Sequence, residues 1–280
     1  MPQTTIKTLR KISQKGTTEP YWISRYFVRP FSIYLSYVLI KLKVTPNTVT
    51  LISAVFALIG SFVLIWPSKI IYIVSASSIF LFFFLDHVDG ELARYYSQEE
   101  GNKATSQVIN ISGKYFDRVF HYFQGASFYT CLGAGLSFYE NSEIWVLLGV
   151  VAGLGSSGFP RFTACFDLLN VVKKSRSKQF FEYIDIYSRF NVVHFSEEGS
   201  LANSFTFPRS LSDLILIGRQ MVGFPGNITL FFITVIINSI FFIDSIFLYK
   251  LYLSFFSIIL FLNTIYSLGK YLRILKGVPR

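Results

Sequence analysis

Acidic side chains at helical spacing mark one part of this chain. Asp86 and Asp89 stand three residues apart at the end of a long apolar stretch, within the run FLDHVDGELARYY. Residues three or four apart share one face of a helix, so both carboxylates lie on the same face as Ala93. The next apolar stretch carries a second stripe with a spacing of four, made of Gly113, Asp117, His121 and Gly125. Two consecutive antiparallel spans would place these stripes opposite each other near one membrane surface.

Three carboxylates in such a place favour a divalent-cation site. Close to hydrocarbon, carboxylates repel one another and lose hydration, so they need cations, protons or basic partners. Mg²⁺ is usually held by a few carboxylates, waters and substrate phosphates. The alternative is a set of structural salt bridges to Arg94, Arg118 or Arg161. We favour the cation site, because residues with little or no side chain lie in register with the acids and leave room for a bulky substrate: Gly90, Ala93, Gly113 and Gly125.

The composition is that of a membrane protein. The 280 residues are 52% hydrophobic and 15% charged, whereas soluble globular proteins carry roughly 25% charged residues. The net charge of +10 does not indicate a nucleic-acid partner here. In a chain this apolar, basic loops more simply follow the positive-inside rule and meet anionic lipid or substrate.

An all-α integral membrane bundle of six transmembrane helices is the predicted fold. A span needs about 20 apolar residues, and six stretches qualify: 49–66, 70–94, 113–138, 144–168, 227–242 and 247–271. These belong to one predicted domain over residues 44–280. Pro46 cannot continue a preceding helix, and Asn47 or Thr48 is expected to cap the first span.

The residues before the first span are of two kinds. Residues 1–20 form a polar, basic segment without the apolar core of a cleavable signal peptide. Residues 21–43 are apolar but are interrupted by Arg25, Arg29 and Pro30. This pattern predicts an interfacial amphipathic helix lying on the membrane, with a seventh span as the alternative.

Basic residues predict the orientation. With six spans, both termini and the loops 95–112 and 169–225 share one side of the membrane. Of the 26 lysines and arginines, only Lys69 and Lys250 fall on the other side. The positive-inside rule therefore predicts a multi-pass protein whose termini and acidic cluster are cytoplasmic.

The acidic run resembles the signature of the CDP-alcohol phosphotransferase family, D-x-x-D-G-x-x-A-R followed by G-x-x-x-D-x-x-x-D. DHVDGELAR at 86–94 matches the first half at every fixed position, and GKYFDRVFH at 113–121 matches at Gly113 and Asp117. VTPNTVT at 44–50 also looks like the family's entry to its first span, and the predicted spans agree with its layout. The resemblance covers at least residues 21–138 by motif, and the rest of the chain by topology alone.

The resemblance implies a membrane transferase of phospholipid or related metabolism. It would move a substituted phosphate, for example phosphatidyl from CDP-diacylglycerol, to an acceptor alcohol and release CMP. Two Mg²⁺ or Mn²⁺ ions would be held by Asp86, Asp89 and Asp117. The CDP group would contact the two aspartates of the first half together with Gly90, Ala93, Arg94 and Gly113. Arg118 and Arg161 are weaker candidates for binding the acceptor, and a homodimer is expected from the family.

Two departures from the motif concern its second half. His121 replaces the last aspartate, and eighteen residues separate Arg94 from Gly113 instead of the usual eight. A neutral imidazole accepts protons near pH 7, so we assign His121 as the base that activates the acceptor; a metal-ligand or structural role is the alternative. The insertion, 95–112, is expected to extend a cytoplasmic loop.

Two other functions fit the same residues. A cation-coupled transporter would also use intramembrane acids, although such sites usually lie at the membrane midplane between repeats. A family member that has lost activity through the missing aspartate would act as a scaffold. The residues are compatible with glycerol phosphate, inositol or its phosphate, serine or an amino alcohol as the acceptor, and with a lipid on either the donor or the acceptor.

Overall fold

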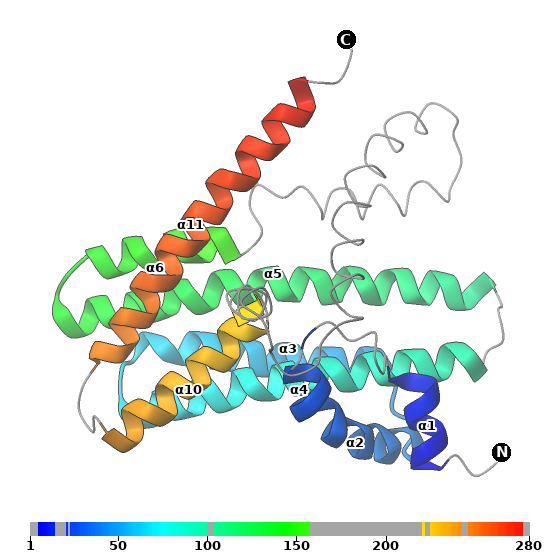
Figure 1. The fold of residues 1–280 in the computed structure, drawn as a ribbon. Helices are drawn as coiled ribbons and strands as arrows, with labels where there is room; N and C mark the ends of the chain where they lie inside the picture. The colour runs from blue at the N-terminus through cyan, green and yellow to red at the C-terminus, as the bar shows by residue number, and fades with distance from the viewer. Residues whose placement is uncertain are drawn as a thin grey trace, which may run out of the picture. The chain divides into compact units, whose positions relative to one another are not determined.

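The computed structural model describes residues 5–14, 21, 23–99, 104–156, 220–221, 225–241 and 246–276. Within them the secondary structure is helical and contains no strand, as expected. Figure 1 labels the α-helices, and two short helical turns complete the order of elements along these residues. They are α1 (Ile6–Ser13), the π-helical turn η2 (Ser24–Val28), α2 (Arg29–Lys41), α3 (Pro46–Phe62), the 3₁₀ turn η3 (Val63–Ile65), α4 (Lys69–Glu99), α5 (Ala104–Glu140), α6 (Ile144–Ser156), α10 (Gly226–Phe241) and α11 (Phe247–Lys276).

Three helices in the described part are long and apolar enough to cross a membrane: Pro46–Ile65, Lys69–Ser97 and Phe247–Tyr266. Two shorter apolar helices are α6 and α10. In the most apolar windows of the first two candidate spans, 39% of the residues are buried, so most apolar side chains there face outward. Outward-facing apolar helices indicate a membrane protein.

Several predicted boundaries differ from those observed. Thr45, not Asn47 or Thr48, caps α3: its Oγ1 accepts a hydrogen bond from the Thr48 amide at 3.3 Å. Pro46 then occupies the first helical position, where its missing N–H costs nothing. The expected loop at 95–112 is also mostly helical, because α4 continues to Glu99 and α5 begins at Ala104. Its polar residues are compatible with helices that extend beyond the apolar spans.

The turn between α2 and α3 sets the direction of the chain before the acidic motif. Lys43 takes the left-handed conformation with φ 56°. Its amide donates to the Ile40 carbonyl, and the Val44 amide donates to the Leu39 carbonyl, both at 3.0 Å. This pair of bonds is the Schellman arrangement, which satisfies carbonyls left over at a helix end.

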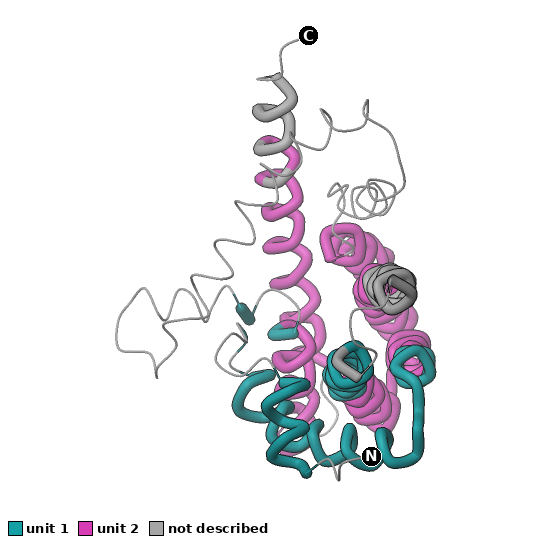
Figure 2. Tube along the Cα trace, turned by 90° about the vertical axis from the view of Figure 1, so that its right-hand side faces the viewer, with its two compact units in different colours: residues 1–53, 83–117, 165–226 teal, residues 54–82, 118–164, 227–280 magenta. Residues whose placement is uncertain are grey.

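The described residues divide into two compact units, coloured in Figure 2. Unit 1 contains residues 1–53, 83–117 and 165–226, and unit 2 contains residues 54–82, 118–164 and 227–280. Within unit 1, α1 and α2 pack on the second half of α4 through a cluster around Leu9, Ile33 and Tyr95. The end of the predicted second span thus belongs to the same unit as the N-terminal helices.

Unit 2 is packed through aromatic rings and close helix approaches. Phe128 of α5 meets Phe231 of α10 and Tyr252 of α11 edge to face, and Tyr129 of α5 stacks on Tyr252. Glycine allows α5 and α6 to approach each other: a Cβ on Gly133 would lie 2.3 Å from the Trp145 carbonyl oxygen. Small residues serve the same purpose in membrane helices generally, since they let backbones come into contact.

A polar contact holds the ends of three helices in unit 2. Lys250 Nζ donates to Glu140 Oε1 at 2.5 Å, and the Trp145 indole donates to Glu140 Oε2 at 2.9 Å. The hydrogen bond from Lys250 lowers the pKa of the Glu140 carboxyl. Lys250, a basic residue predicted on the non-cytoplasmic side, is therefore paired with an acid.

The α5–α6 approach predicts a steric penalty for a single methyl group. Gly133→Ala should destabilise the protein by about 1–3 kcal/mol, the usual range for an overpacked contact. Thermal unfolding of the purified protein in detergent would show this as a lower midpoint. Gly269→Ala in α11 is the matched control, because a Cβ there meets nothing within 4 Å. Equal midpoints for both variants would show that α5 and α6 do not touch at Gly133.

Candidate functional site

The acidic motif lies on the part of α4 that belongs to unit 1. Its helix is packed on one side: Val88 and Leu92 are fully buried, in a cluster with Val49 of α3. Asp86 and Asp89 are half-buried on the remaining side, as their spacing predicts. Because Val88 and Leu92 are packed on the cluster side of α4, the two carboxylates are directed away from this cluster.

Asp89 is held by a residue that sequence reasoning did not select. Thr50 Oγ1 of α3 donates to Asp89 Oδ2 at 2.7 Å, and it also lies 3.1 Å from the Pro46 carbonyl. A carboxylate fixed at one oxygen keeps a defined orientation for its second oxygen. The signal for this contact was present in the VTPNTVT run, which places Thr50 one turn after Pro46 on α3.

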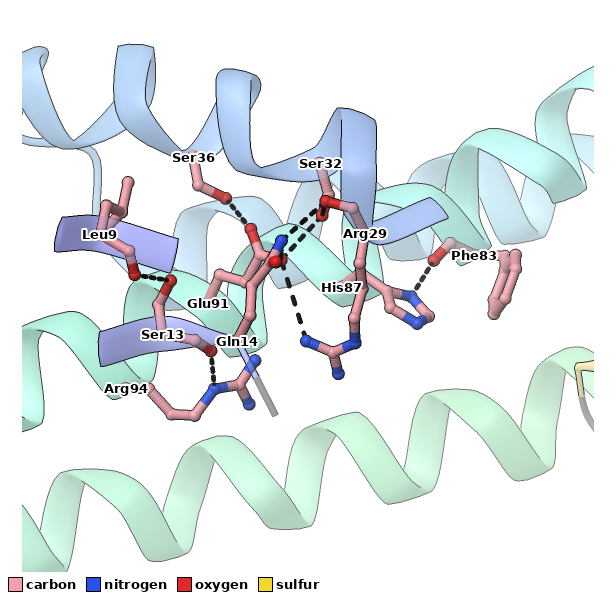
Figure 3. Close-up of polar contacts among 10 residues, drawn as sticks. All are labelled: Leu9, Ser13, Gln14, Arg29, Ser32, Ser36, Phe83, His87, Glu91 and Arg94. Atoms are coloured by element: carbon pink, nitrogen blue, oxygen red, sulfur yellow. Dashed lines mark hydrogen bonds and ion pairs between the residues drawn. The ribbon is translucent and has the colours of Figure 1, made fainter. Parts of the chain in front are cut away.

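Arg94 bends back along α4 instead of extending from it. Its Nε donates to the Ser13 carbonyl at the end of α1 (Figure 3). The two terminal nitrogens lie 3.2 and 3.5 Å from the point that a Cβ on Gly90 would occupy. The space over Gly90, predicted to receive substrate, is therefore lined by the motif arginine, which is half-buried there.

A buried carboxylate in the middle of the motif was missed entirely by the sequence analysis. Glu91 is fully buried, and Figure 3 shows side chains from the N-terminal helices converging on it. Its Oε1 accepts from Ser32 Oγ at 2.7 Å and from Gln14 Nε2 at 2.9 Å. Its Oε2 accepts from Ser36 Oγ at 2.6 Å. Both oxygens are thus bound, which is what a buried charge requires.

The charge of Glu91 is balanced by Arg29 of α2. The Arg29 Nη1 atom lies 3.9 Å from Glu91 Oε1, and the two side chains are 7% and 0% exposed. Gln14 connects this pair to the backbone, because its amide nitrogen also donates to the Arg29 carbonyl at 2.7 Å. Arg29 was predicted only as an interruption of an interfacial helix, and here it is a buried counter-ion.

His121 lies on α5 within unit 2. Its ring centroid is 5.2 Å from that of Phe82, the residue four positions before Asp86 on α4, and the imidazole is half-buried. The expectation that Gly125 leaves room for a substrate is wrong. A Cβ there would lie 2.9 Å from Ser156 Oγ, so this glycine accommodates α6 instead.

The remaining predicted residues lie where the side chains are not described. Gly113, Asp117 and Arg118 belong to helix α5, and Arg161 falls outside the described residues. Among the described side chains, no group of three or more His, Cys, Asp and Glu residues could hold a metal ion. The convergence of Asp117 on the first two aspartates stays a prediction.

The described carboxylates of the motif are of the type that binds hard divalent ions. Asp86 and Asp89 offer oxygen atoms only, and they lie one turn apart on one helix. One or two carboxylates, completed by water and substrate phosphate, are a common protein contribution to Mg²⁺. The two aspartates are thus of the chemical kind that contributes to binding such an ion.

Comparison with known proteins does not identify the chain. No model of a known protein family matches the sequence. No curated protein matches it either. The resemblance to the CDP-alcohol phosphotransferase signature therefore depends on the motif residues alone.

The Glu91 contacts predict which buried serines matter for stability. Ser36→Ala would leave Glu91 Oε2 without its hydroxyl donor, at a cost of about 1–3 kcal/mol for an unsatisfied buried acceptor. The change should appear as a lower thermal midpoint in detergent. Ser61→Ala is the control: Ser61 is equally buried, but among the described residues its hydroxyl bonds only to the Ala57 carbonyl of its own helix. A midpoint lowered equally by both substitutions would contradict a special role for the Glu91 contact.

Proposed function

We propose that the protein is a CDP-alcohol phosphotransferase. It transfers a substituted phosphate from a CDP-linked donor, such as CDP-diacylglycerol, to the hydroxyl of an acceptor alcohol and releases CMP. The observation that carries this proposal is the run Asp86–Arg94 on one helix, with Asp89 oriented by Thr50 and the Arg94 guanidinium laid over Gly90. Carboxylates and a guanidinium on adjoining turns are a suitable environment for metal-bound phosphate.

Two divalent ions, Mg²⁺ or Mn²⁺, would be held by Asp86 and Asp89 together with Asp117 of α5. When bound, these ions supply positive charge to the pyrophosphate and to the departing CMP. Thr50 donates to one Asp89 oxygen and so fixes the orientation of this carboxylate. The protein's own contribution is a fixed set of oxygen ligands that does not have to rearrange when the donor arrives.

Arg94 binds the donor's phosphates from beside Gly90. Its Nε is used by the Ser13 carbonyl, which directs the terminal nitrogens over the glycine. Ala93 and Gly113 are further positions at which the CDP group can approach a helix backbone. Phosphoryl transfer needs this positioning and charge neutralisation more than it needs covalent help from the protein.

His121 serves as the base in this proposal. The acceptor oxygen forms a bond to the phosphorus of the substituted phosphate while the bond to CMP breaks, and the hydroxyl proton passes to the imidazole. A neutral imidazole has the right basicity near pH 7. Arg118 and Arg161 are proposed to bind an anionic acceptor.

The proposed membrane arrangement has six spans with the termini and the site on the cytoplasmic side. Helix α2 then lies at the interface, since it and its flanks expose an apolar stripe with helical spacing: Phe27, Phe31, Tyr34, Val38 and Leu42. These side chains are 49–67% exposed, which suits contact with lipid. The functional unit is proposed to be a homodimer in the bilayer.

Release of CMP tests the proposed reaction. The purified protein, given CDP-diacylglycerol and a panel of acceptors (glycerol phosphate, inositol, inositol phosphate, serine), should release CMP with Mg²⁺ or Mn²⁺ and not with EDTA. Asp89→Asn should lower the rate by at least about a hundredfold, as losses of preorganised charge in active sites do. No release from this donor or from CDP-linked amino alcohols would favour the transporter or the scaffold.

Matched threonines make the same assay sharper. Thr50→Val removes the hydroxyl that orients Asp89 and should slow CMP release about tenfold, the equivalent of one good hydrogen bond to a charged group. Thr234→Val should leave the rate unchanged, because in the described part of the chain the Thr234 hydroxyl bonds only to the Leu230 carbonyl of its own helix. If the two variants are equally active, Thr50 has no part in orienting a ligand.

The base is tested by replacing His121. We expect His121→Ala to reduce the maximal rate by about 10²–10⁴-fold, the usual contribution of general base catalysis. His121→Asp should recover part of that loss and move the acidic limb of the pH–rate profile to lower pH, since a carboxyl has a lower intrinsic pKa. An alanine variant with a nearly wild-type rate would remove His121 from the mechanism.

A further inference from the structure

Glu91 is a charged residue that the proposed reaction does not use. It is not one of the fixed positions of the motif, and it lies two residues after Asp89. At 100° per residue, this places it on nearly the opposite face of α4 from that carboxylate. It is nevertheless fully buried and accepts hydrogen bonds from three side chains of the N-terminal helices. A buried charge with so many partners requires a reason other than catalysis.

Gln14 links Glu91 to the motif arginine. Its amide nitrogen donates to Glu91 Oε1 at 2.9 Å and to the Arg29 carbonyl at 2.7 Å. These two bonds fix Gln14, the residue that directly follows α1. The preceding residue, Ser13, presents the carbonyl that accepts from Arg94 Nε. The carboxylate and the guanidinium, three residues apart on α4, are thus bound to adjacent residues of another segment (Figure 3).

The position of this segment depends on tertiary contacts. Helix α1 has eight residues, and isolated helices of that length are marginal in water. Its apolar anchor is Leu9, which packs with Ile33 and Tyr95. Beyond Leu9, Ile12 packs against the same cluster. Gln14, the residue next to the carbonyl that Arg94 needs, is held by its bonds to Glu91 and to the Arg29 carbonyl.

We propose that Glu91 is a positioning residue for phosphate binding. Through Gln14 and the Ser13 carbonyl it holds the Arg94 guanidinium over Gly90, in the place where the anionic donor is bound. Gln14 and the Ser13 carbonyl at the end of α1 then position Arg94 for the donor without being binding residues themselves. This inference rests on the proposed function for the role of Arg94, and its contact chain can be tested without turnover.

Gln14→Leu tests the chain with little change of volume and leaves Glu91 its bonds to Ser32 and Ser36. We expect a rise of about tenfold in the KM for the donor, comparable to the loss of one hydrogen bond to a charged group, with kcat changed less than twofold. In an Arg94→Gln background the same substitution should have almost no effect, because the residue it positions is gone. Effects that multiply independently in the double variant would overturn the proposal.

Ser24→Ala is the control for general damage to the N-terminal segment. Ser24 is buried in η2, and its hydroxyl has no hydrogen-bond partner among the described residues. Its loss should leave the KM for the donor at the wild-type value. A KM raised equally by Ser24→Ala and Gln14→Leu would mean that the segment responds to any change, which contradicts a specific path to Arg94.

The reactivity of Arg94 separates this inference from the proposed reaction. Phenylglyoxal modification of Arg94, followed by peptide mass spectrometry, should be several times faster in Gln14→Leu and Glu91→Gln than in the wild type. Unchanged rates in both variants would overturn the positioning role. Faster modification in a protein that releases no CMP would support the contact chain and reject the transferase.

Discussion

A full negative charge buried inside a membrane protein constrains everything around it. Removing a carboxylate from water costs several kcal/mol unless hydrogen bonds and an opposite charge replace the lost hydration. At Glu91 the replacement is provided by Gln14, Ser32 and Ser36, with Arg29 as counter-ion. All four come from the N-terminal helices, so these helices can pack on α4 in one register only. A shift of one residue would leave the charge without donors.

This constraint gives α4 three distinct sides within one unit. Val88 and Leu92 face an apolar cluster, Glu91 faces the polar contacts of α1 and α2, and the half-buried aspartates occupy the remaining side. Because two of the sides are packed, the helix cannot rotate to bury its acids. The placement of the two aspartates, which the proposed chemistry requires, therefore follows from the packing of the other two sides of α4.

Helix α2, which we propose to lie at the membrane interface, reverses the usual pattern of burial. Its buried residues include Ser32, Ser36 and Arg29, while Phe31 and Tyr34 are more than half exposed. In water such an arrangement would be costly, because apolar area would face solvent. Beside lipid it is favourable, since the polar side chains pair with Glu91 inside and the aromatic ones meet the bilayer or its interface.

What the sequence by itself determined is local or compositional. It predicted an all-helical membrane protein, the positions of α3, α4 and α11, and the common face of Asp86 and Asp89, because these depend on hydropathy and on spacing within a few residues. Tertiary structure decided the rest: Gln14 meets Glu91 across 77 residues, and Thr50 meets Asp89 across 39. Glu91 shares no periodic pattern with its partners. Only the packing of the helices shows that this residue, which is not a fixed position of the motif, joins the N-terminal segment to α4.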